Sequence, residues 1–385
     1  MNLLFIHSSS DLYGSDKSLF RTIKTLSDNG HVCHVILPKA GPLADKLKCI
    51  DCRVIIWEIA IIRRQLIRGW GLLHIVFTWF IAEIKIGLLI KENNIQIVHI
   101  NTTAVINGQI SSFFLRRVVL QHVREITIKP VFLARLLASF NGLLSTEILA
   151  VSEAVKSHLS DIAPKYKNKI TVIANGIKPQ PIGKPTMTRS EFSRRYRFPN
   201  NTVVIGCVGR LHYWKGQDYL IESISVLGDI GLDYCLLIAG DVYPGYEYYE
   251  EKIKNDIIKY NLSKNVKLLG FIENIPAFLN NIDLLVLPST LPDPLPGVIL
   301  EAMAAKLPVI ATNHGGATEM VIPEKTGLLI SKDDPGNFAA ALKRLLKNAK
   351  LRTLMGEEGY RHYCNKYTID IYESNISAIF SAYSV

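Results

Sequence analysis

Short apolar runs alternate with longer segments of helical periodicity from the first residue of this 385-residue chain. The runs are rich in β-branched residues and apolar on both faces, which is typical of strands buried in a parallel sheet with helices on both sides. In chain order they are LLFIH, HVCHVILP, CRVIIW, IQIVHIN, VVLQHVRE, EILAVS and ITVIANG, then TVVIGCVGR, YCLLIAGD, NVKLLG, LLVLPS, LPVIATN and TGLLI. This alternation predicts an α/β fold with two tandem doubly wound, Rossmann-like domains.

The two series of strands are separated by a stretch in which the alternation stops. Residues 178–201, KPQPIGKPTMTRSEFSRRYRFPNN, are rich in Pro, Lys and Arg. Since the chain is too long for one ordinary core, we place the boundary here, with domains at 1–180 and 181–365 that face a cleft. The last segment, 366–385, has the pattern of an amphipathic helix with no strand after it. Our hypothesis is that it packs back on the N-terminal domain.

The segment Ile59–Ile90 combines a basic start with many apolar residues. Its longest charge-free run, Gly69–Ala82, has about 14 residues, fewer than the roughly 18 to 20 that a spanning helix needs, so we expect no membrane span. Two interpretations stay open: a surface that dips into lipid headgroups, or an ordinary buried helix preceded by a basic loop. The residues that favour the first are Arg63, Arg64, Arg68, Trp70, Phe77, Trp79 and Phe80.

Composition and charge narrow the range of partners. The chain is 48% hydrophobic and 20% charged, as expected of a globular protein. A formal charge of +10 indicates an anionic partner, which could be nucleic acid, an acidic membrane face or a phosphorylated small molecule. We find no RNP-type, zinc-finger or helix-turn-helix signature, so we expect no nucleic acid.

The N-terminus and the cysteines bear on location and metals. MNLLFIHSSSDLYG has no basic n-region, so we predict a strand rather than a secretory signal and a cytoplasmic protein. Peripheral contact with the inner face of the cytoplasmic membrane is a hypothesis. Only Cys49 and Cys52 form a C-x-x-C pair, and because a second pair or a histidine partner is missing we assign no metal.

Two common phosphate-binding motifs are missing. The first strand is followed by SSSDLYGSDKSL, which lacks G-x-G-x-x-G and so disfavours a nicotinamide or flavin dehydrogenase. GRLHYWKG is no Walker loop, because its lysine precedes the final glycine. Gly14 nonetheless lies before a predicted helix that opens near Ser15 and Asp16, where backbone N–H groups could face an anion. A plain turn is the simpler explanation of a lone glycine.

The segment GCVGRLHYWKGQDYL places Arg210 and Lys215 between a strand end and a helix of the second domain. An arginine fork together with a mobile lysine suits a diphosphate. Ordinary solvated cations would not require both residues at the carboxyl end of the sheet, where ligands of such folds bind. We therefore favour phosphate binding.

Two carboxylates flank a proline-rich turn in LPDPLPGVILEAMA. The prolines stiffen the loop and Gly297 permits a tight backbone path. Asp293 lies in the loop and Glu301 about one turn into the predicted helix, so both can face the expected cleft. One carboxylate suits the vicinal hydroxyls of a ribose and the other those of a hexose, while helical N–H groups near Gly297 would face the phosphates between them.

Together these motifs resemble glycosyltransferase family 4, a group of retaining, nucleotide-sugar-dependent enzymes with the GT-B fold. GRLHYWKG is similar to the family's phosphate-binding Arg and Lys segment, and DPLPGVILEAMA to its E-x7-E segment. IANGI, residues 173–177, is similar to the end of the N-terminal domain, and GGATEMV to the loop that follows E-x7-E. The likeness is close over Thr202–Leu346 and looser in the first domain.

The resemblance implies a role for each matching residue. Arg210 and Lys215 would contact the diphosphate and stabilise it as leaving group, Glu301 would hold the ribose, and Asp293 with the backbone after it would hold the donor sugar. The first domain would bind the acceptor and the second the nucleotide sugar. The implied donor-binding residues are Gly14, Arg210, Lys215, Asp293, Leu295, Pro296, Gly297, Val298 and Glu301; the implied catalytic residues are His122, Arg210, Lys215, Asp293 and Glu301.

His122, in VLQHVRE, is similar to a family histidine that approaches the donor sugar. Without the family it would be interpreted as a buried core histidine. Arg124 and Glu125 beside it are expected to shape the acceptor side. Two departures from the family pattern stand out: Asp293 replaces the usual Glu and is one methylene shorter, and the glycine-rich first loop is reduced to Gly14.

The resemblance implies hexosyl transfer, without a metal or cofactor, from a nucleotide sugar to a saccharide or lipid-linked saccharide of a surface polysaccharide such as lipopolysaccharide, O-antigen or capsule. Retention would follow from a front-face reaction in which the departing diphosphate helps to deprotonate the acceptor. Two alternatives remain: a nucleotide-sugar epimerase of the same fold, and a catalytically silent sugar-nucleotide-binding scaffold.

Overall fold

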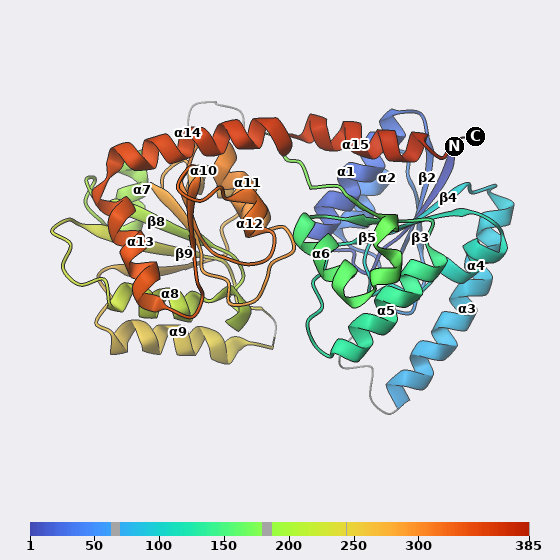
Figure 1. The fold of residues 1–385 in the computed structure, drawn as a ribbon, viewed down its shortest axis with the longest axis horizontal. Coiled ribbons are helices and arrows are strands. Elements are labelled where there is room, and N and C mark those ends of the chain that lie inside the picture. Colours follow the sequence, from blue (N-terminus) through green and yellow to red (C-terminus); the bar gives the residue numbers. More distant parts are fainter. Residues whose placement is uncertain (63–69, 179–186, 244, 385) are drawn as a thin grey trace. The chain divides into compact units, whose positions relative to one another are not determined.

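The computed structural model describes residues 1–62, 70–178, 187–243 and 245–384, and Figure 1 shows the chain as a ribbon. The chain divides into two compact units. The first is Met1–Asn175 together with Asp370–Val385, and the second is Gly176–Ile369. Arg63, Arg64 and Arg68 of the basic segment lie outside the described residues, as does the side chain of Trp70.

The first unit is built on a seven-stranded sheet in the order β3-β2-β1-β4-β5-β6-β7. All neighbouring strands run parallel, and the interior strands are buried almost without interruption. This burial on both faces explains the unbroken apolar runs in the sequence. The strands are β1 (Asn2–Ile6), β2 (Val32–Leu37), β3 (Arg53–Ile56), β4 (Ile97–Ile100), β5 (Val118–Val123), β6 (Glu147–Ala150) and β7 (Ile170–Val172).

Helices connect these strands, and the last helix of the chain joins them. They are α1 (Gly14–Asp28), α2 (Pro42–Lys48), α3 (Trp70–Glu92), α4 (Gln109–Phe114), α5 (Val131–Leu144), α6 (Glu153–Ile162), a short 3₁₀ helix (Pro164–Lys169) and α15 (Ile369–Ser381). From Asp370 onward α15 belongs to this unit. Its Tyr372 hydroxyl lies 2.6 Å from Thr22 Oγ1, and the ring of Phe380 stacks on that of Phe5 at 6.2 Å between centroids.

The second unit has a six-stranded parallel sheet in the order β10-β9-β8-β11-β12-β13. Its strands are β8 (Val203–Val208), β9 (Tyr234–Ala239), β10 (Val266–Gly270), β11 (Leu284–Leu287), β12 (Val309–Thr312) and β13 (Gly327–Ile330). Its helices are α7 (Arg189–Tyr196), a 3₁₀ turn (Tyr213–Lys215), α8 (Gln217–Ser225), α9 (Glu247–Lys259), α10 (Ile275–Leu279), α11 (Gly297–Ala304), α12 (Ala317–Met320), α13 (Pro335–Lys347) and α14 (Ala349–Lys366).

Both sheets are doubly wound, as the sequence predicts. In each sheet the strand order reverses once, between β1 and β4 in the first unit and between β8 and β11 in the second. Loops that leave the carboxyl ends of two such strands diverge to opposite sides, and ligands of open α/β sheets bind in the crevice between them. The loops after β1, β4, β8 and β11 are therefore the places to look for a site.

Helix α3 is longer than its charge-free run suggests. Among the described residues, Leu73–Glu92 is long and apolar enough to cross a membrane by length and composition. Length alone therefore does not exclude a span. One face of the helix, however, packs against the first sheet, because Ala82, Ile86 and Leu89 belong to a buried cluster with residues of its strands.

Candidate active site

Three of the predicted residues lie at the carboxyl edge of the second sheet, beside its order reversal. Arg210 follows β8 after one glycine, and Asp293 lies in the loop that follows β11. Glu301 lies within α11, the helix that this loop enters, and is partly buried. Strand ends at a reversal point are where open α/β sheets bind ligands, so the fold places these side chains where a ligand would be expected.

Lys215 and Asp293 form an ion pair that the sequence did not predict. Lys215 Nζ lies 2.6 Å from Asp293 Oδ1, and the two side chains are 24% and 17% exposed. The other carboxylate oxygen accepts a hydrogen bond from Ser289 Oγ at 2.6 Å. Asp293 is therefore held from both sides, and its charge compensates that of Lys215 in the protein without ligand.

Ser289 is in turn fixed by two residues of the next strand and its loop. Thr312 Oγ1 and His314 Nε2 both donate to the Ser289 carbonyl oxygen, at 2.6 and 2.7 Å. Burial lowers the pKa of His314, which favours the neutral ring. Sequence reasoning missed all three residues, because nothing in their spacing marks them as supports of Asp293.

Two glycines permit the close approaches on which this arrangement depends. Gly216 ends the Lys215 turn at a φ of 69°, and a Cβ there would lie 2.0 Å from the carbonyl oxygen of Pro288. Gly315 has a φ of 61°, and a Cβ there would lie 2.4 Å from the carbonyl oxygen of Asp293. Only glycine fits such positions without strain. The GG of the GGATEMV motif thus lets one loop pack against the Asp293 loop.

Arg210 lies beside a group of aromatic side chains. Its guanidinium carbon is 5.1 Å from the ring centroid of Tyr243, within the range of a cation–π contact. His212 stacks on Trp214 at 3.8 Å and approaches Tyr246 at 3.9 Å between centroids. Burial, and then Lys215, lower the pKa of His212. The rings restrict the loop that carries Arg210 and Lys215.

The predicted donor-binding backbone forms the start of α11. Leu295 and Pro296 precede the helix, and Gly297 and Val298 are its first two residues. Pro296 provides no side-chain cap, and no atom lies within 4 Å of a Cβ built on Gly297. An uncapped helix start offers backbone N–H groups and a partial positive charge. This geometry is compatible with an anion near Gly297, and the role itself remains a prediction.

His122 and Gly14 belong to the first unit. Gly14 is the first residue of α1; it is exposed, and a Cβ there would meet no atom within 4 Å. Next to it, Asp16 is buried and accepts hydrogen bonds from His7 Nε2 at 2.7 Å and from the Tyr13 backbone N–H at 2.9 Å. Burial raises the pKa of Asp16, but the hydrogen bond and charge of His7 and the hydrogen bonds of Tyr13 and Ser9 together outweigh it, so the net shift is downward.

His122 is completely buried at the end of β5, and Arg124 defines its protonation. Arg124 Nη2 lies 3.2 Å from His122 Nδ1, and His99 Nε2 lies 3.3 Å from the same atom. A guanidinium can only donate, so Nδ1 must accept and the ring proton must be on Nε2. Burial, Arg124 and His99 together hold the pKa of His122 well below its ordinary value. The ring is a neutral hydrogen-bond donor.

Arg124 itself is held by two asparagines from distant parts of the unit. Its Nε donates to Asn101 Oδ1 at 2.7 Å and its Nη1 to Asn175 Oδ1 at 2.9 Å. Asn175 is the asparagine of the IANGI motif, and it also accepts from Ser18 Oγ at 2.7 Å. The motif that marks the end of the first unit therefore helps to fix the arginine that fixes His122.

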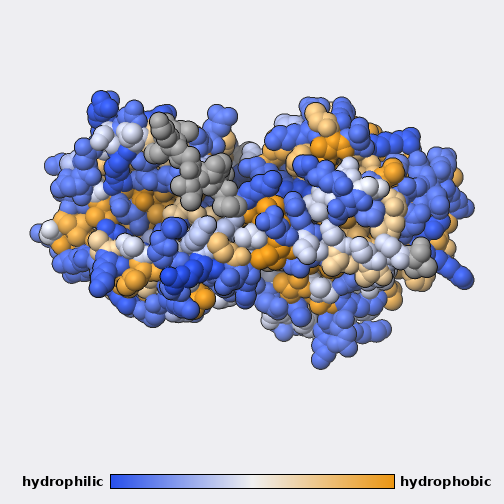
Figure 2. Space-filling view, turned by 90° about the horizontal axis from the view of Figure 1, so that it is seen from above, coloured by the Kyte–Doolittle hydropathy of each residue, from blue (hydrophilic) through white to orange (hydrophobic). Residues whose placement is uncertain are grey.

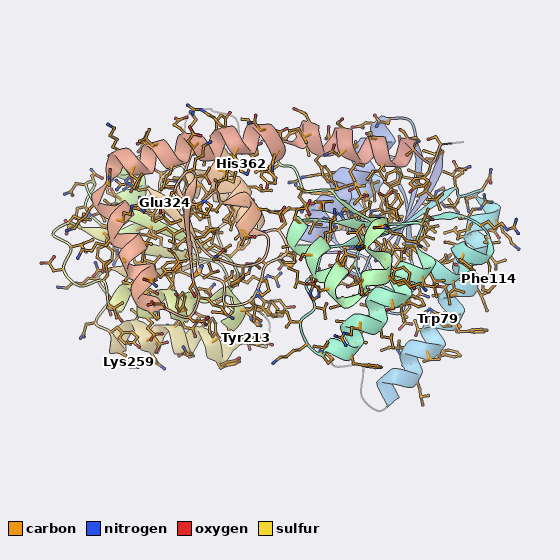
Figure 3. The ribbon with its side chains drawn as sticks, viewed as in Figure 1. Trp79, Phe114, Tyr213, Lys259, Glu324 and His362 are labelled. Atoms are coloured by element: carbon orange, nitrogen blue, oxygen red, sulfur yellow. The ribbon has the colours of Figure 1, made fainter. Side chains whose placement is uncertain are left out.

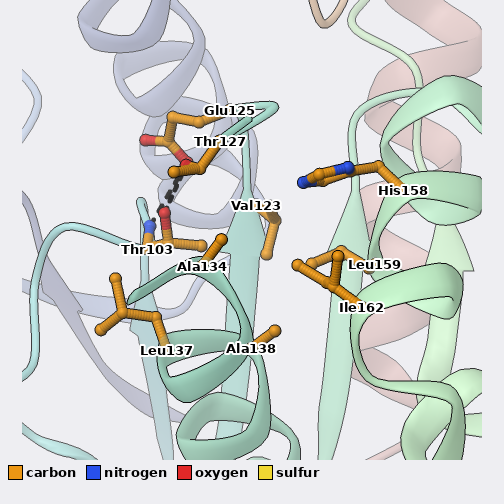
Figure 4. Close-up of a pocket in the computed structure, with 10 residues that line it drawn as sticks. All are labelled: Thr103, Val123, Glu125, Thr127, Ala134, Leu137, Ala138, His158, Leu159 and Ile162. Atoms are coloured by element: carbon orange, nitrogen blue, oxygen red, sulfur yellow. Dashed lines mark hydrogen bonds between the residues drawn. The ribbon is translucent and has the colours of Figure 1, made fainter. Parts of the chain in front are cut away.

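Glu125 lines a cavity of about 20 Å³ between α5 and α6 (Figure 4). Its carboxylate accepts hydrogen bonds from Thr102 Oγ1, and from Thr103 N and Oγ1 at 3.3 and 3.2 Å. Figure 4 shows the ring of His158 directed into the cavity from α6, and its buried Nε2 has no hydrogen-bond partner among the described residues. The space suffices for a water molecule or a methyl group.

A second cavity, of about 200 Å³, lies in the second unit away from Arg210 and Lys215. It is lined by Ile322, Lys325, Glu358, Arg361, His362 and Asn365. Over the described ranges, no three or more His, Cys, Asp or Glu side chains converge in a way that could hold a metal. Metal independence of any reaction remains a prediction.

Two family models match the chain, one on each unit. The model described as Glycosyltransferase Family 4 matches residues 13–180, and that described as Glycosyl transferases group 1 matches residues 188–362. The second match contains Arg210, Lys215, Asp293 and Glu301, and the first contains Gly14 and His122.

Among curated proteins, the chain is similar to the capsular polysaccharide biosynthesis glycosyltransferase CapM of Staphylococcus aureus. The two are 27% identical over 312 residues, which cover 78% of this chain and 80% of CapM. This chain is also similar to the lipopolysaccharide core biosynthesis mannosyltransferase LpcC of Rhizobium leguminosarum bv. viciae. The two are 24% identical over 179 residues, which cover 46% of this chain and 51% of LpcC.

Among solved structures, the fold is similar to that of Anabaena Alr3699/HepE in complex with UDP. The TM-score is 0.85 at 22% identity, and the match covers 99% of this chain and 100% of that one. At 22% identity the similarity shows the fold alone, and this fold agrees with the two doubly wound sheets described above.

Proposed function

The chain belongs to glycosyltransferase family 4 and is a glycosyltransferase, and from that membership we propose that it transfers a hexosyl unit from a nucleotide sugar to a saccharide or lipid-linked saccharide with retention of configuration. The observation that carries the proposal is the position of Arg210, Lys215 and Asp293 on the loops that leave β8 and β11. These are the two strands between which the order of the second sheet reverses.

The donor in this proposal is bound by charge and by backbone. Arg210 and Lys215 neutralise the diphosphate, Glu301 accepts the ribose hydroxyls, and Asp293 accepts hydroxyls of the sugar. HepE, whose fold this chain shares, was solved in complex with UDP-glucose, which supports a nucleotide sugar as the ligand class. Preorganised cations at a leaving group are commonly the largest electrostatic contribution to catalysis.

Lys215 has two partners in the proposed reaction. Without donor its charge is compensated by Asp293 at 2.6 Å. A diphosphate that binds there shares or replaces Asp293 as the partner of Lys215, and Asp293 is then available to a sugar hydroxyl. As negative charge grows on the leaving diphosphate, Arg210 and Lys215 stabilise it, and the diphosphate accepts the acceptor's proton. No protein nucleophile is needed in this scheme.

The acceptor belongs, in our proposal, to a surface polysaccharide. Support comes from the relatives, since CapM is named for capsular polysaccharide and LpcC for the lipopolysaccharide core. Such acceptors are built at a membrane, so we propose a cytoplasmic enzyme in peripheral contact with an anionic bilayer. In our proposal the first unit binds the acceptor, and Arg124 and Glu125, which follow β5, shape that side of the site.

Nucleotide release tests this function against its alternatives. A panel of nucleotide sugars is first screened for protection against thermal unfolding, because a ligand that binds only the folded state stabilises it. Nucleotide release from the protecting donor is then measured with and without saccharide acceptors. Release that depends on acceptor, with a retained anomer in the product, supports the proposal. Conversion of donor without acceptor indicates an epimerase, and binding without any turnover indicates a scaffold.

A further inference from the structure

The outer face of α3 is an exposed apolar stripe. Among the side chains of this helix that the structure describes, seven large apolar ones are exposed, including Phe77 at 67% and Phe80 at 59%. Their spacing repeats every three to four residues, so they lie on one side of the helix. The stripe consists of Leu73, Val76, Phe77, Phe80, Ile81, Ile84 and Leu88.

The inner face of the same helix is fixed to the first unit. Ala82, Ile86 and Leu89 are part of the buried cluster that includes residues of β1 and β4. Trp79 Nε1 donates to the Ile106 carbonyl at 2.8 Å, and the buried Glu83 carboxylate accepts the backbone N–H groups of Gly108 and, at 2.8 Å, of Ser111 at the start of α4. A helix anchored in this way cannot leave the sheet to cross a bilayer. Its outer face can only be covered where it lies.

Two neighbouring helices extend the apolar surface. Helix α3 packs against α4, and α4 against α5. In Figure 1 the three lie on the side of the first unit away from α15, and Figure 3 labels Trp79 on α3 and Phe114 on α4. Phe114 is 77% exposed. We call this the α3–α5 face: the α3 stripe with Phe113, Phe114, Val131, Phe132, Leu136 and Leu143.

The surface on the opposite side has a different character. Figure 2 views the molecule from the side on which α15 lies, and there hydrophobic side chains form separated patches among hydrophilic ones. Many exposed large apolar side chains on helices that pack side by side are uncommon on a protein that stays fully in water, and they indicate a site of contact with a partner or a membrane.

The chemistry of the face indicates which of these it is. Its exposed apolar side chains, which are Phe, Leu, Ile and Val, suit a protein partner as well as a membrane, because Phe is also enriched at protein–protein interfaces, so the charge around the face decides between them. Between residues 57 and 144 the sequence has ten Lys and Arg, four Glu and no Asp. Of these charged residues, Glu83 is buried, and Arg124 is bonded inside the unit to His122, Asn101 and Asn175, so neither contributes to the charge of the face. An apolar face within a strongly basic segment is complementary to acyl chains beneath anionic headgroups.

We propose that the α3–α5 face docks on an anionic lipid bilayer, with α3 lying flat in the headgroup layer and its stripe turned toward the acyl chains. The choice of partner rests on the proposed function, in which a lipid-linked acceptor brings the substrate to a membrane. The proposed docking surface adds α4 and α5 to α3. Both helices lie outside the segment Ile59–Ile90 that the sequence singled out.

Vesicle flotation tests the docking with the full-length protein. One set of vesicles is phosphatidylcholine and the other is phosphatidylcholine mixed with phosphatidylglycerol. The wild type should float with the anionic vesicles and bind the neutral ones weakly. Phe77→Ser/Phe80→Ser should lower binding by at least about tenfold, because two exposed aromatic rings no longer enter the apolar layer. Both rings are exposed, so the thermal unfolding midpoint should not change.

Matched controls separate this face from apolar surface in general. Ile258→Ser/Leu354→Ser removes two exposed apolar side chains from the second unit and should bind vesicles as the wild type does. Lys129→Glu/Arg135→Glu should weaken binding to anionic vesicles, whereas Lys264→Glu in the second unit should not. Equal flotation of wild type and Phe77→Ser/Phe80→Ser overturns the proposal. So does a lipid-free dimer that this variant abolishes, because the occupant would then be a second copy of the chain.

The outcome is independent of sugar transfer. Donor protection and nucleotide release are measured without lipid, so a protein that turns over a nucleotide sugar but ignores vesicles refutes the docking alone. A protein that binds anionic vesicles through this face but accepts no nucleotide sugar refutes the proposed function alone.

Discussion

At the scale of single residues, the structure shows pairs of polar side chains that the sequence presented only as separate residues. The sequence identified Lys215 and Asp293 as separate ligands for two parts of a donor, whereas the structure joins them in one ion pair. The two are 78 residues apart along the chain, and their pairing depends on two loops meeting at a sheet edge. Periodicity can place each loop after its strand, but it gives no information on which side chains touch.

The buried pair of His7 and Asp16 gives a pH prediction. The pKa of Asp16 is lower in the folded protein than its ordinary value near 3.9, so the folded state favours the ionised carboxylate. The stabilisation is therefore fully present above about pH 4 and is lost as the pH falls through the lower, folded value. We predict that Asp16→Asn lowers the free energy of unfolding by about 1–3 kcal/mol at neutral pH.

Urea denaturation of both proteins at several pH values checks this. The difference between wild type and Asp16→Asn should shrink as the pH falls below about 4, because protonation of Asp16 removes from the wild type the charge that the variant lacks at every pH. A difference that stays constant down to the lowest pH at which both fold would mean that the carboxylate charge does not contribute.

The protonation of His122 can be observed directly. Arg124 and His99 both face Nδ1, so we predict a neutral ring protonated on Nε2 at neutral pH. Ring ¹⁵N chemical shifts of labelled protein distinguish this tautomer from the other one and from the imidazolium. If the Nε2 proton serves a ligand, His122→Gln, whose amide can donate from a similar place, should keep more transfer activity than His122→Phe. A ring protonated on Nδ1 would contradict the assignment of Arg124 as the group that orients it.

At the scale of elements, the order and type of strands follow from the sequence because each strand is an uninterrupted apolar run. The packing of α15 does not follow, since an amphipathic pattern shows that a helix has an apolar face but not which surface covers it. The same holds for α3, whose two apolar faces have different environments. Its inner face meets β1 and β4, and its outer face is exposed. Because both faces are apolar, the composition of the helix does not show which face is buried and which is exposed.

The glycines of the site loops offer a matched pair of substitutions. At Gly315 a Cβ would lie 2.4 Å from the Asp293 carbonyl oxygen at a φ of 61°, whereas at Gly297 it would meet nothing within 4 Å. Gly315→Ala should cost at least about 1 kcal/mol of stability and displace the Asp293 loop, so transfer should fall. Gly297→Ala should change the free energy of unfolding by no more than about 0.5 kcal/mol.

Thermal unfolding and donor binding by both variants separate strain from ligand contact. If phosphates approach the start of α11, Gly297→Ala should weaken donor binding without a loss of stability. Gly315→Ala with wild-type stability would show that the close approach of the two loops is not needed.

At the scale of the whole molecule, each unit has its own proposed role, and either role can fail without the other. The second unit would bind the activated sugar through Arg210 and Lys215, and the first would bind the acceptor and a membrane. The sequence predicted the two α/β units and the residues at the sheet edge. It could not supply the supports of those residues, such as Ser289 and His314, because these interactions connect loops that are distant in sequence.

Calorimetry tests most directly whether Arg210 and Lys215 hold the diphosphate. Binding of the protecting nucleotide sugar is measured for wild type, Arg210→Ala, Lys215→Ala and, as a control, Lys264→Ala. A charge-assisted hydrogen bond contributes about 1.5–3 kcal/mol, so each site variant should lose at least about tenfold in affinity while Lys264→Ala binds as the wild type does. If no nucleotide sugar binds the wild type, or if Arg210→Ala and Lys215→Ala bind it undiminished, the two cations do not hold the diphosphate and the account is wrong.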